Sequence, residues 1–335
     1  MRLPAILSSL VGLAALITLV VMNGATQIEQ GIAAAGWSIA FVVILHLPQV
    51  AFSSLGWRAV VSSARLPSRS VFFGLRLIRE AVNGLLPVAQ IGGDLVAARL
   101  LTLGGVPLSM AGASVTVDRT LELLTQVAFT ILGVGLLIAS PESTGLPRSV
   151  TVATIAVLGG LAVIFLLAQR FGVFRLLETS LLRLARKRNW KALEAVAGLH
   201  QSIVGLYKSP RRLLLGGGLH FISWLLGGLE VLVGLQVLGV TVDFREALII
   251  ESLGQAFRAM GFAVPGGLGV QEGGVILICG LMGIGPQSAI ELSLLRRFRE
   301  VVLGVPGLLA WYWVEAPRAA RTVPSKEELT RETTS

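Results

Sequence analysis

Long runs of apolar residues constrain the fold of this chain more than any other feature of its sequence. Four of them, residues 3–22, 36–56, 150–169 and 213–239, are each close to the ~20 residues that a helix needs to cross about 30 Å of hydrocarbon. Only 14% of the residues are charged, whereas a typical soluble domain has about 25%. The sequence therefore predicts an all-α polytopic integral membrane protein.

Several kinds of functional site are excluded by the residue types that the chain lacks. Its one cysteine, Cys279, rules out a disulfide framework and a thiolate metal cluster. The three histidines, His46, His200 and His220, are too far apart in the sequence for an HExxH metal site. The GGLGVQEGG segment lacks the Lys-Ser/Thr pair of a phosphate-binding loop, and no Ser/His/Asp set is recognisable. We therefore predict no catalytic residues, no metal site and no cofactor.

Basic residues are concentrated in one loop. The chain has a formal net charge of +9, and residues 170–212 contain ten lysines and arginines against two glutamates. Because cytoplasmic loops are enriched in Lys and Arg, this basic loop is expected to be cytoplasmic. Apolar residues at helical spacing predict amphipathic helices on the inner membrane face, or a helical hairpin packed on itself. We expect the loop to bind anionic lipid and not nucleic acid, for which it has no recognisable module.

The charges of the loops also predict the topology, with both termini in the cytoplasm. We expect the membrane to be a bacterial cytoplasmic (inner) membrane. The expected spanning helices cover residues 4–22, 36–56, 121–140, 149–167 and 213–238, and a last helix ends at 311–313. Together they form one transmembrane domain, residues 1–316. The polar tail, residues 317–335, is expected to be disordered.

Polar residues recur along the chain at a constant offset of 178 residues, as from Pro87 to Pro265, and this spacing is called the repeat offset below. Four pairs match at this offset: Pro87 with Pro265, Asp94 with Glu272, Arg119 with Arg297, and Glu122 with Glu300. After the same shift, the helices predicted at 36–56 and 121–140 fall on the helix at 213–238 and on the last helix. The sequence therefore predicts two repeats, at about 4–140 and about 149–316.

The loop charges predict that the two repeats are inverted in the membrane. The polar segment at about 70–119 begins and ends on the inside, whereas the segment at about 245–297 begins and ends on the outside. Proline and glycine within apolar sequence predict an interrupted or re-entrant helix in each, tolerated where the backbone is buried or lines a wet cavity. Inverted repeats with broken helices are typical of transporters. The predicted breaks are Pro87, Gly92, Gly93, Pro265, Gly266, Gly267 and Gly269.

Ionisable residues in these segments are candidates for a central polar cavity. A charge at the centre of a membrane helix costs about 2.5–3.5 kcal/mol on insertion scales, so such residues usually face a cavity or one another. Asp94 and Glu272 lie beside glycine breaks, which favours a functional role. The predicted cavity residues are Asp94, Arg119, Glu272 and Arg297, with Asn83, Gln90, Arg99, Gln271, Glu122, Glu300 and Arg258 as supporting polar residues.

A structural role is an equal alternative for some of these charges. Arg119 with Glu122, and Arg297 with Glu300, are one helical turn apart and suit local ion pairs. Glu230 and His220, within the helix at 213–238, are expected to make helix–helix contacts.

Three separated segments resemble the transmembrane domain of the lysylphosphatidylglycerol synthase family: NGLLPVAQIGGDLVAAR (83–99), DRTLEL (118–123) and VPGGLGVQEG (264–273). The resemblance covers about residues 5–316, and within the family the chain is most similar to hopanoid-associated members. The family often has Gly-Glu where this chain has Gly93-Asp94, so the carboxylate is kept but shortened. The resemblance does not extend to the aminoacyl-transferase domain fused to some members, so it does not imply lysyl transfer. It implies translocation of a lipid or lipid-linked substrate, or support of an envelope-lipid pathway.

We therefore expect the protein to move an amphipathic lipid, such as a hopanoid, a phospholipid or a lipid-linked substrate, between leaflets. The alternative is an intramembrane enzyme or accessory protein of envelope-lipid (hopanoid) biosynthesis, with lipid-biosynthesis or other envelope proteins as partners. A third interpretation is a small-ion or solute exporter, whose cavity opens to water but not sideways to lipid. A purified enzyme changes lipid chemistry, whereas a transporter changes only the distribution of lipid between leaflets.

Overall fold

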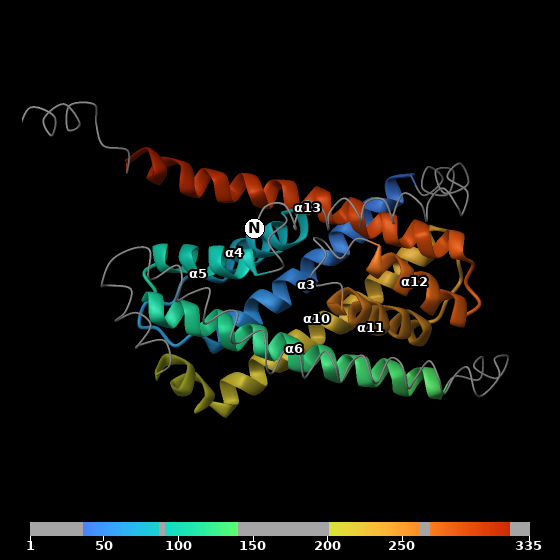
Figure 1. The fold of residues 1–335 in the computed structure, drawn as a ribbon, viewed down its shortest axis with the longest axis horizontal. Helices are drawn as coiled ribbons and strands as arrows, with labels where there is room; N and C mark the ends of the chain where they lie inside the picture. Colours follow the sequence, from blue (N-terminus) through green and yellow to red (C-terminus); the bar gives the residue numbers. More distant parts are fainter. Residues whose placement is uncertain (1–35, 87–90, 140–200, 261–268, 322–335) are drawn as a thin grey trace, which may run out of the picture.

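The computed structural model describes residues 36–86, 91–139, 201–260 and 269–321. Every regular element in these ranges is a helix (Figure 1). The helices expected at 4–22 and 149–167, the loop at 23–35, most of the basic loop (170–200) and the end of the tail (322–335) lie outside the described residues. So do five of the predicted site and break residues: Pro87, Gln90, Pro265, Gly266 and Gly267.

The described helices form two sets in the same order. The first set is η1 (Gly36–Ser38), α3 (Ile39–Val60), α4 (Arg69–Leu85), α5 (Gly92–Leu103) and α6 (Leu108–Ile138). The second set is α10 (Pro210–Val237), α11 (Phe244–Met260), α12 (Val270–Leu281) and α13 (Pro286–Arg321). The repeat offset found in the sequence separates α5 from α12 at both ends, and the start of α6 from the start of α13.

Three described helices are long and apolar enough to span a membrane: Gly36–Val60, Leu108–Ile138 and Pro210–Val237, with 25, 31 and 28 residues. Each exceeds the ~20 residues that a crossing requires. Large apolar side chains such as Ile131 and Leu214 are more than half exposed, as expected for positions that face lipid. Every regular element in the described residues is a helix and three of them are candidate spans, so the prediction of an all-α polytopic membrane protein is confirmed, whereas the inverted repeats stay a prediction.

Two pairs of shorter helices lie at opposite ends of the molecule. The α4 and α5 helices have 17 and 12 residues, fewer than a crossing needs. Figure 1 shows the α4–α5 pair toward one end of the long axis and the α11–α12 pair toward the other. Each pair connects the end of one long helix to the start of the next at the same end, as a re-entrant segment does.

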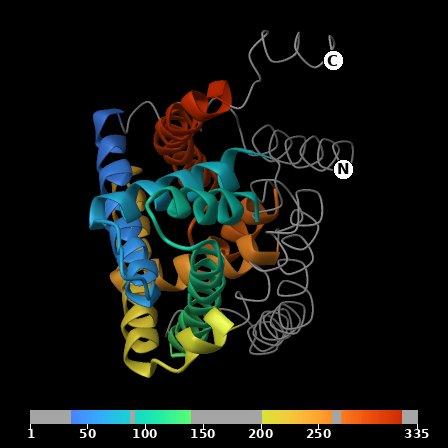
Figure 2. The same ribbon diagram turned by 90° about the vertical axis from the view of Figure 1, so that its left-hand side faces the viewer.

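The corresponding long helices of the two sets run in opposite directions. Figure 1 shows α6 and α13 antiparallel along the long axis, and α3 and α10 likewise. Their packing partners are reciprocal, since α4 packs along α13 whereas α11 packs along α6. Figure 2 shows α4 and α5 between α13 and α6. An inverted repeat requires such a relation, and the membrane side that each half faces stays a prediction.

Small residues bring α3 and α10 together at the centre. A Cβ on Gly56 would lie 3.1 Å from the Gly216 carbonyl oxygen, so these two backbones approach closely. Nearby, the Ser53 hydroxyl donates to the Ser223 hydroxyl at 2.9 Å. Small residues and interhelical hydrogen bonds are the usual means of helix association in membranes, because hydrocarbon solvates apolar side chains as well as the protein does.

Each half has its own apolar core. In the first half, Trp57 of α3 meets Phe72 of α4 edge to face, with ring centroids 5.1 Å apart, and both side chains are fully buried. In the second half, Ile250 of α11 and Ile278 of α12 belong to a separate buried cluster that also includes residues of α10 and α13.

Two helices are longer than the sequence pattern predicts. The α6 helix begins at Leu108, although a spanning helix was expected only from 121. The α13 helix runs from Pro286 to Arg321, so residues 317–321 of the expected tail are helical. Asp118 and Arg119 made residues 108–120 look like an interruption, but Asp118 pairs with Arg79 of α4 and Arg119 with Asp94 of α5, so neither charge opposes a continuous helix. Interruptions at Leu85–Gly92 and Met260–Val270 separate the short helices.

Candidate functional site

The charged residues of the first half meet around one buried arginine. Arg79 of α4 is 1% exposed. Its guanidinium contacts three carboxylates: Asp94 (Nε–Oδ1, 2.5 Å), Asp118 (Nη1–Oδ2, 2.5 Å) and Glu122 (Nη2–Oε2, 3.2 Å). Arg76, one turn earlier, places its Nη2 2.7 Å from Oε1 of Glu122. The forked donors of arginine are suited to holding several carboxylate oxygens in fixed geometry.

Local helical spacing explains why these groups meet. In α4, Arg79 and Glu80 lie three and four residues after Arg76, so both neighbour Arg76 on one face of the helix. In α6, Asp118 and Glu122 are four apart and point the same way. The α4 helix is amphipathic overall, and it turns this charged face toward α5 and α6 while Phe72 and Ile78 enter the apolar core.

The start of α5 is held against the end of α4. The Gly93 N–H donates to Oδ1 of Asn83 at 2.8 Å. A Cβ at Gly93 would overlap the Arg79 carbonyl oxygen and lie 2.8 Å from the same Asn83 oxygen, so only glycine permits this approach. Asp94 then occupies the first turn of α5, where the helix dipole stabilises a carboxylate. Of the predicted break residues, Gly92 begins α5, and the close approach at Gly93 positions Asp94.

The second half also places a carboxylate in the first turn of its short helix, α12, but there the carboxylate itself caps the helix. Gly269 has a φ of +80°, a conformation that favours glycine, and its N–H donates to Oε2 of Glu272 at 2.6 Å. The other oxygen, Oε1, accepts from Nε of Arg297 at 2.9 Å. Glu272 is 1% exposed. Glu272 thus caps α12 and pairs with α13 at the same time. It is the third residue of α12, as Asp94 is the third residue of α5.

Equivalent ion pairs occur in the two halves. Asp94 Oδ2 lies 3.6 Å from Arg119 Nε, and Glu272 Oε1 lies 2.8 Å from Arg297 Nη2. Arg119 and Arg297 also form the two local pairs expected from the sequence, with Glu122 at 3.0 Å and Glu300 at 2.9 Å. The structure therefore brings all six residues into ion pairs, and their role in transport stays a prediction.

Residues of α3, α10 and α13 connect the charged residues around Arg79 in the first half with those around Arg297 in the second half. Glu230 of α10, 3% exposed, accepts from Arg299 of α13 and from Gln49 Nε2 at 2.5 Å. The same Glu230 lies 3.1 Å from Nδ1 of His46, whose Nε2 lies 3.4 Å from Glu80. His220, on α10, lies 2.7 Å from Asp118. Helix–helix contacts by Glu230 and His220, expected from the sequence, are confirmed.

The remaining predicted residues lie at different distances from this network. Arg258 of α11 pairs with Glu300 at 2.7 Å and belongs to it, and Gln271 accepts from Arg297 at 3.5 Å. Arg99 does not. Its side chain is 58% exposed and makes two hydrogen bonds, of 2.8 and 3.0 Å, to Glu315 near the end of α13.

Several central residues were not singled out as site residues by the sequence. Arg79 and Arg76 gave a signal, since two arginines three apart in an apolar stretch need partners at membrane depth. Asp118 directly precedes the predicted Arg119, so it too was recognisable. His46 gave none, because a single histidine in an apolar helix does not reveal which carboxylates face it.

In this network the buried arginines and carboxylates neutralise one another. Removing one partner of a buried ion pair typically costs about 3–5 kcal/mol, so each contact constrains the helices that it joins. Because several arginines touch two or three carboxylates, a guanidinium can exchange partners without losing all of its ion pairs. Among the described residues, no group of three His, Cys, Asp or Glu side chains is placed to hold a metal ion.

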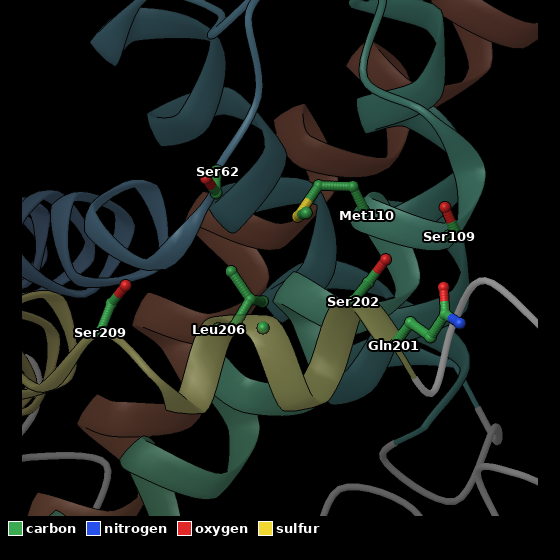
Figure 3. A pocket seen from close by; sticks show the side chains of 8 residues that line it. Ser62, Ser109, Met110, Gln201, Ser202, Leu206 and Ser209 are labelled. Carbon is green, nitrogen blue, oxygen red and sulfur yellow. The ribbon is translucent and has the colours of Figure 1, made fainter.

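A cavity of about 470 Å³ lies away from the network, where residues 201–209 pack against the end of α3 and the start of α6. Figure 3 shows Ser202 and Leu206 extending toward Ser62 and Met110. Ser109, Gln201, Gly205 and Ser209 complete its lining. Its hydroxyl and amide groups suit a small polar group, but no charged side chain lines it.

The comparisons with known proteins agree with the resemblance found in the sequence. The family model described as the lysylphosphatidylglycerol synthase TM region matches residues 5–307. A UPF0104 membrane protein of Methanothermobacter thermautotrophicus is 24% identical over 305 residues, which cover 86% of this chain and 88% of that protein. No solved structure matches the chain. Because the family model spans nearly all of the sequence, this chain belongs to the lysylphosphatidylglycerol synthase transmembrane-region family.

Proposed function

We propose that this protein moves an amphipathic lipid between the two leaflets of the bacterial inner membrane. The observation that carries the proposal is the pair of equivalent ion pairs, Asp94–Arg119 and Glu272–Arg297, at the starts of two short helices that lie toward opposite ends of the molecule. Membership of a family named for lipid synthesis supports a lipid substrate. Hopanoids, phospholipids and lipid-linked substrates are the candidate classes.

The exposure of the arginines indicates how a headgroup would bind. The side chains of Arg119 and Arg297 are 22% and 16% exposed, whereas that of Arg79 is 1% exposed. A phosphate-bearing headgroup that reaches Arg119 or Arg297 would receive charge-assisted hydrogen bonds from the guanidinium. Asp94 and Glu272 hold these guanidinium groups in place when no headgroup is bound. The apolar helix surfaces accommodate the lipid tails.

The antiparallel halves supply a route between leaflets. If the α4–α5 pair enters from the cytoplasm and the α11–α12 pair from the outside, each ion pair serves the cavity when it opens to one side. In this topology both termini and the basic loop, residues 170–212, are cytoplasmic, and the loop binds anionic lipid. Other envelope-lipid proteins are the proposed partners.

A leaflet-sidedness assay in proteoliposomes tests the proposal. Vesicles carry a trace of fluorescent phospholipid, hopanoid or lipid-linked sugar, and a membrane-impermeant quencher reports the outer leaflet. We expect the wild-type protein to accelerate exchange of at least one probe. The D94N/E272Q double variant should lose this activity, and Glu315→Gln, which removes a carboxylate outside the network, should keep it.

The outcomes separate the possible functions. Full exchange in D94N/E272Q would remove both carboxylates from the mechanism. No acceleration of any probe by the wild-type protein would contradict lipid transport. Mass spectrometry of the same vesicles identifies a chemically altered lipid, which would indicate an intramembrane enzyme instead.

A further inference from the structure

His46 lies between carboxylates that belong to two other helices. Its Nδ1 is 3.1 Å from Oε2 of Glu230 on α10, and its Nε2 is 3.4 Å from Oε2 of Glu80 on α4. His46 itself is on α3, beside Gln49, which also bonds Glu230. Both ring nitrogens of one side chain therefore face an acceptor.

This geometry suits a doubly protonated ring better than a neutral one. A neutral imidazole has one N–H, so it can donate to only one of two carboxylates, whereas the imidazolium ion donates from both nitrogens. Placing the proton on a carboxylate instead would weaken another ion pair, since Glu80 accepts from Arg76 at 2.7 Å and Glu230 accepts from Arg299. The arrangement that satisfies all of these groups is a protonated His46.

The charges around His46 support the same state. The network in the described residues contains the arginines Arg76, Arg79, Arg119, Arg258, Arg296, Arg297 and Arg299. It contains the carboxylates Glu80, Asp94, Asp118, Glu122, Glu230, Glu251, Glu272 and Glu300. Of these groups, the carboxylates of Glu80 and Glu230 face the two ring nitrogens of His46 directly, which favours the imidazolium ion.

We propose that Glu80, His46 and Glu230 form a proton-binding site that couples lipid movement to proton movement across the membrane. This inference rests on the proposed function. The protonated triad links α4, α3 and α10, and Arg299 extends the link to α13. Proton binding thus fastens the short helix of the first half to the central pair of helices.

Proton release follows from the exposure of the three side chains. Glu80 is 33% exposed and Glu230 is 3% exposed, so the accessible side of the triad is Glu80. The Nε2–H bond of His46 breaks and an O–H bond forms on Glu80, which then passes the proton to water and returns to a carboxylate. Neutral His46 keeps its Nδ1–H for Glu230 and offers Glu80 only a lone pair. The His46–Glu80 ion pair between α3 and α4 is lost, which loosens the attachment of α4 to α3 at this point.

Proton binding is measurable without any transport. The chain contains only three histidines, so protein labelled with 15N in its histidine rings gives a resolvable spectrum in lipid nanodiscs. We expect one ring to carry protons on both nitrogens at neutral pH, to lose one of them at alkaline pH, and to be absent from the spectrum of His46→Gln. A His46 that is neutral at every pH would overturn the proposal.

Coupling is tested in the vesicles of the leaflet assay with and without an imposed pH gradient. The wild-type rate should change at least severalfold with the gradient. His46→Gln should abolish this dependence, and so should Glu80→Gln, which leaves the Glu230 contact intact. Glu315→Gln should respond as the wild type does.

The two proposals fail in different ways. Lipid movement that ignores the gradient, or that keeps its wild-type gradient response in His46→Gln, would overturn the coupling and leave lipid transport standing. An absence of lipid movement would contradict the proposed function, and with it the coupling.

Discussion

Asp118 and Arg296 occupy equivalent positions in the two halves, related by the repeat offset, and carry opposite charges. Each is buried and is paired with the first short helix of its own half, Asp118 with Arg79 of α4 at 2.5 Å and Arg296 with Glu251 of α11. The two halves therefore keep an ion pair at this place and reverse its polarity. What the position requires is a pair, whichever residue supplies the positive charge.

Breaking the Glu251–Arg296 pair should destabilise the protein more than removing it. Arg296→Met leaves the Glu251 carboxylate buried without its charged partner, at an expected cost of about 3–5 kcal/mol. The E251L/R296M double variant leaves no buried charge at this position, so it should recover most of the stability that Arg296→Met loses. Thermal unfolding in detergent micelles measures both. A double variant no more stable than Arg296→Met would contradict this interpretation.

The buried Arg79 should matter far more than the exposed Arg99. Arg79→Ala leaves three carboxylates close together, so we expect a loss of several kcal/mol or a failure to fold. Arg99→Ala removes a pair whose arginine is 58% exposed, and such pairs contribute about 0–1 kcal/mol. Yield and thermal stability of the two variants, purified side by side, provide the comparison. Equal losses would show that the network is not a structural unit.

Neutralising either repeat-equivalent carboxylate should impair transport and spare the fold. Asp94→Asn leaves Arg79 with Asp118 and Glu122, and Glu272→Gln keeps an oxygen for the Gly269 N–H. A hydrogen bond to a charged group contributes about 1.5–3 kcal/mol, so we expect lipid exchange to fall by about tenfold or more in each. Exchange and melting temperature are measured on the same preparations. Normal exchange in either variant would assign that carboxylate a structural role.

Most of the fold prediction came from the lengths of the apolar runs and from the positions of the glycines. The helices α3 and α10 follow directly from uninterrupted apolar runs, and the repeat offset anticipated the matching bounds of α5 and α12. The early start of α6 was not anticipated, because 108–120 contains Asp118 and Arg119. Their partners lie on α4 and α5, and a sequence read along one helix does not show that such charges are paired across helices.

The site could be predicted only in part for the same reason. Asp94 and Glu272 were recognised because they follow glycines that mark a break. His46 and Arg299 were not, since each acquires its meaning from Glu230, 184 and 69 residues away along the chain. Contacts of that separation are set by how α3, α10 and α13 pack, and local spacing contains no trace of them.

The interface between α6 and α11 should tolerate no side chain at Gly133. A Cβ there would overlap the hydroxyl of Ser252 and lie 2.8 Å from its Cβ, and Ser252 is fully buried. Overpacking of this kind costs about 1–3 kcal/mol, so Gly133→Ala should lower the melting temperature. Gly135, two residues along the same helix, has open space around it and is the matched control. Gly135→Ala should be neutral or slightly stabilising, since alanine favours helix over glycine.

A second substitution decides whether the clash itself is the cause. Ser252→Gly removes both atoms that the new methyl group would meet, so G133A/S252G should be more stable than the sum of the two single changes predicts. Residues in contact show coupling of about 0.5–3 kcal/mol in such a double-mutant cycle. Additive losses would mean that α6 and α11 do not approach one another at these two residues, and the reciprocal packing of the two halves would then be wrong at this point.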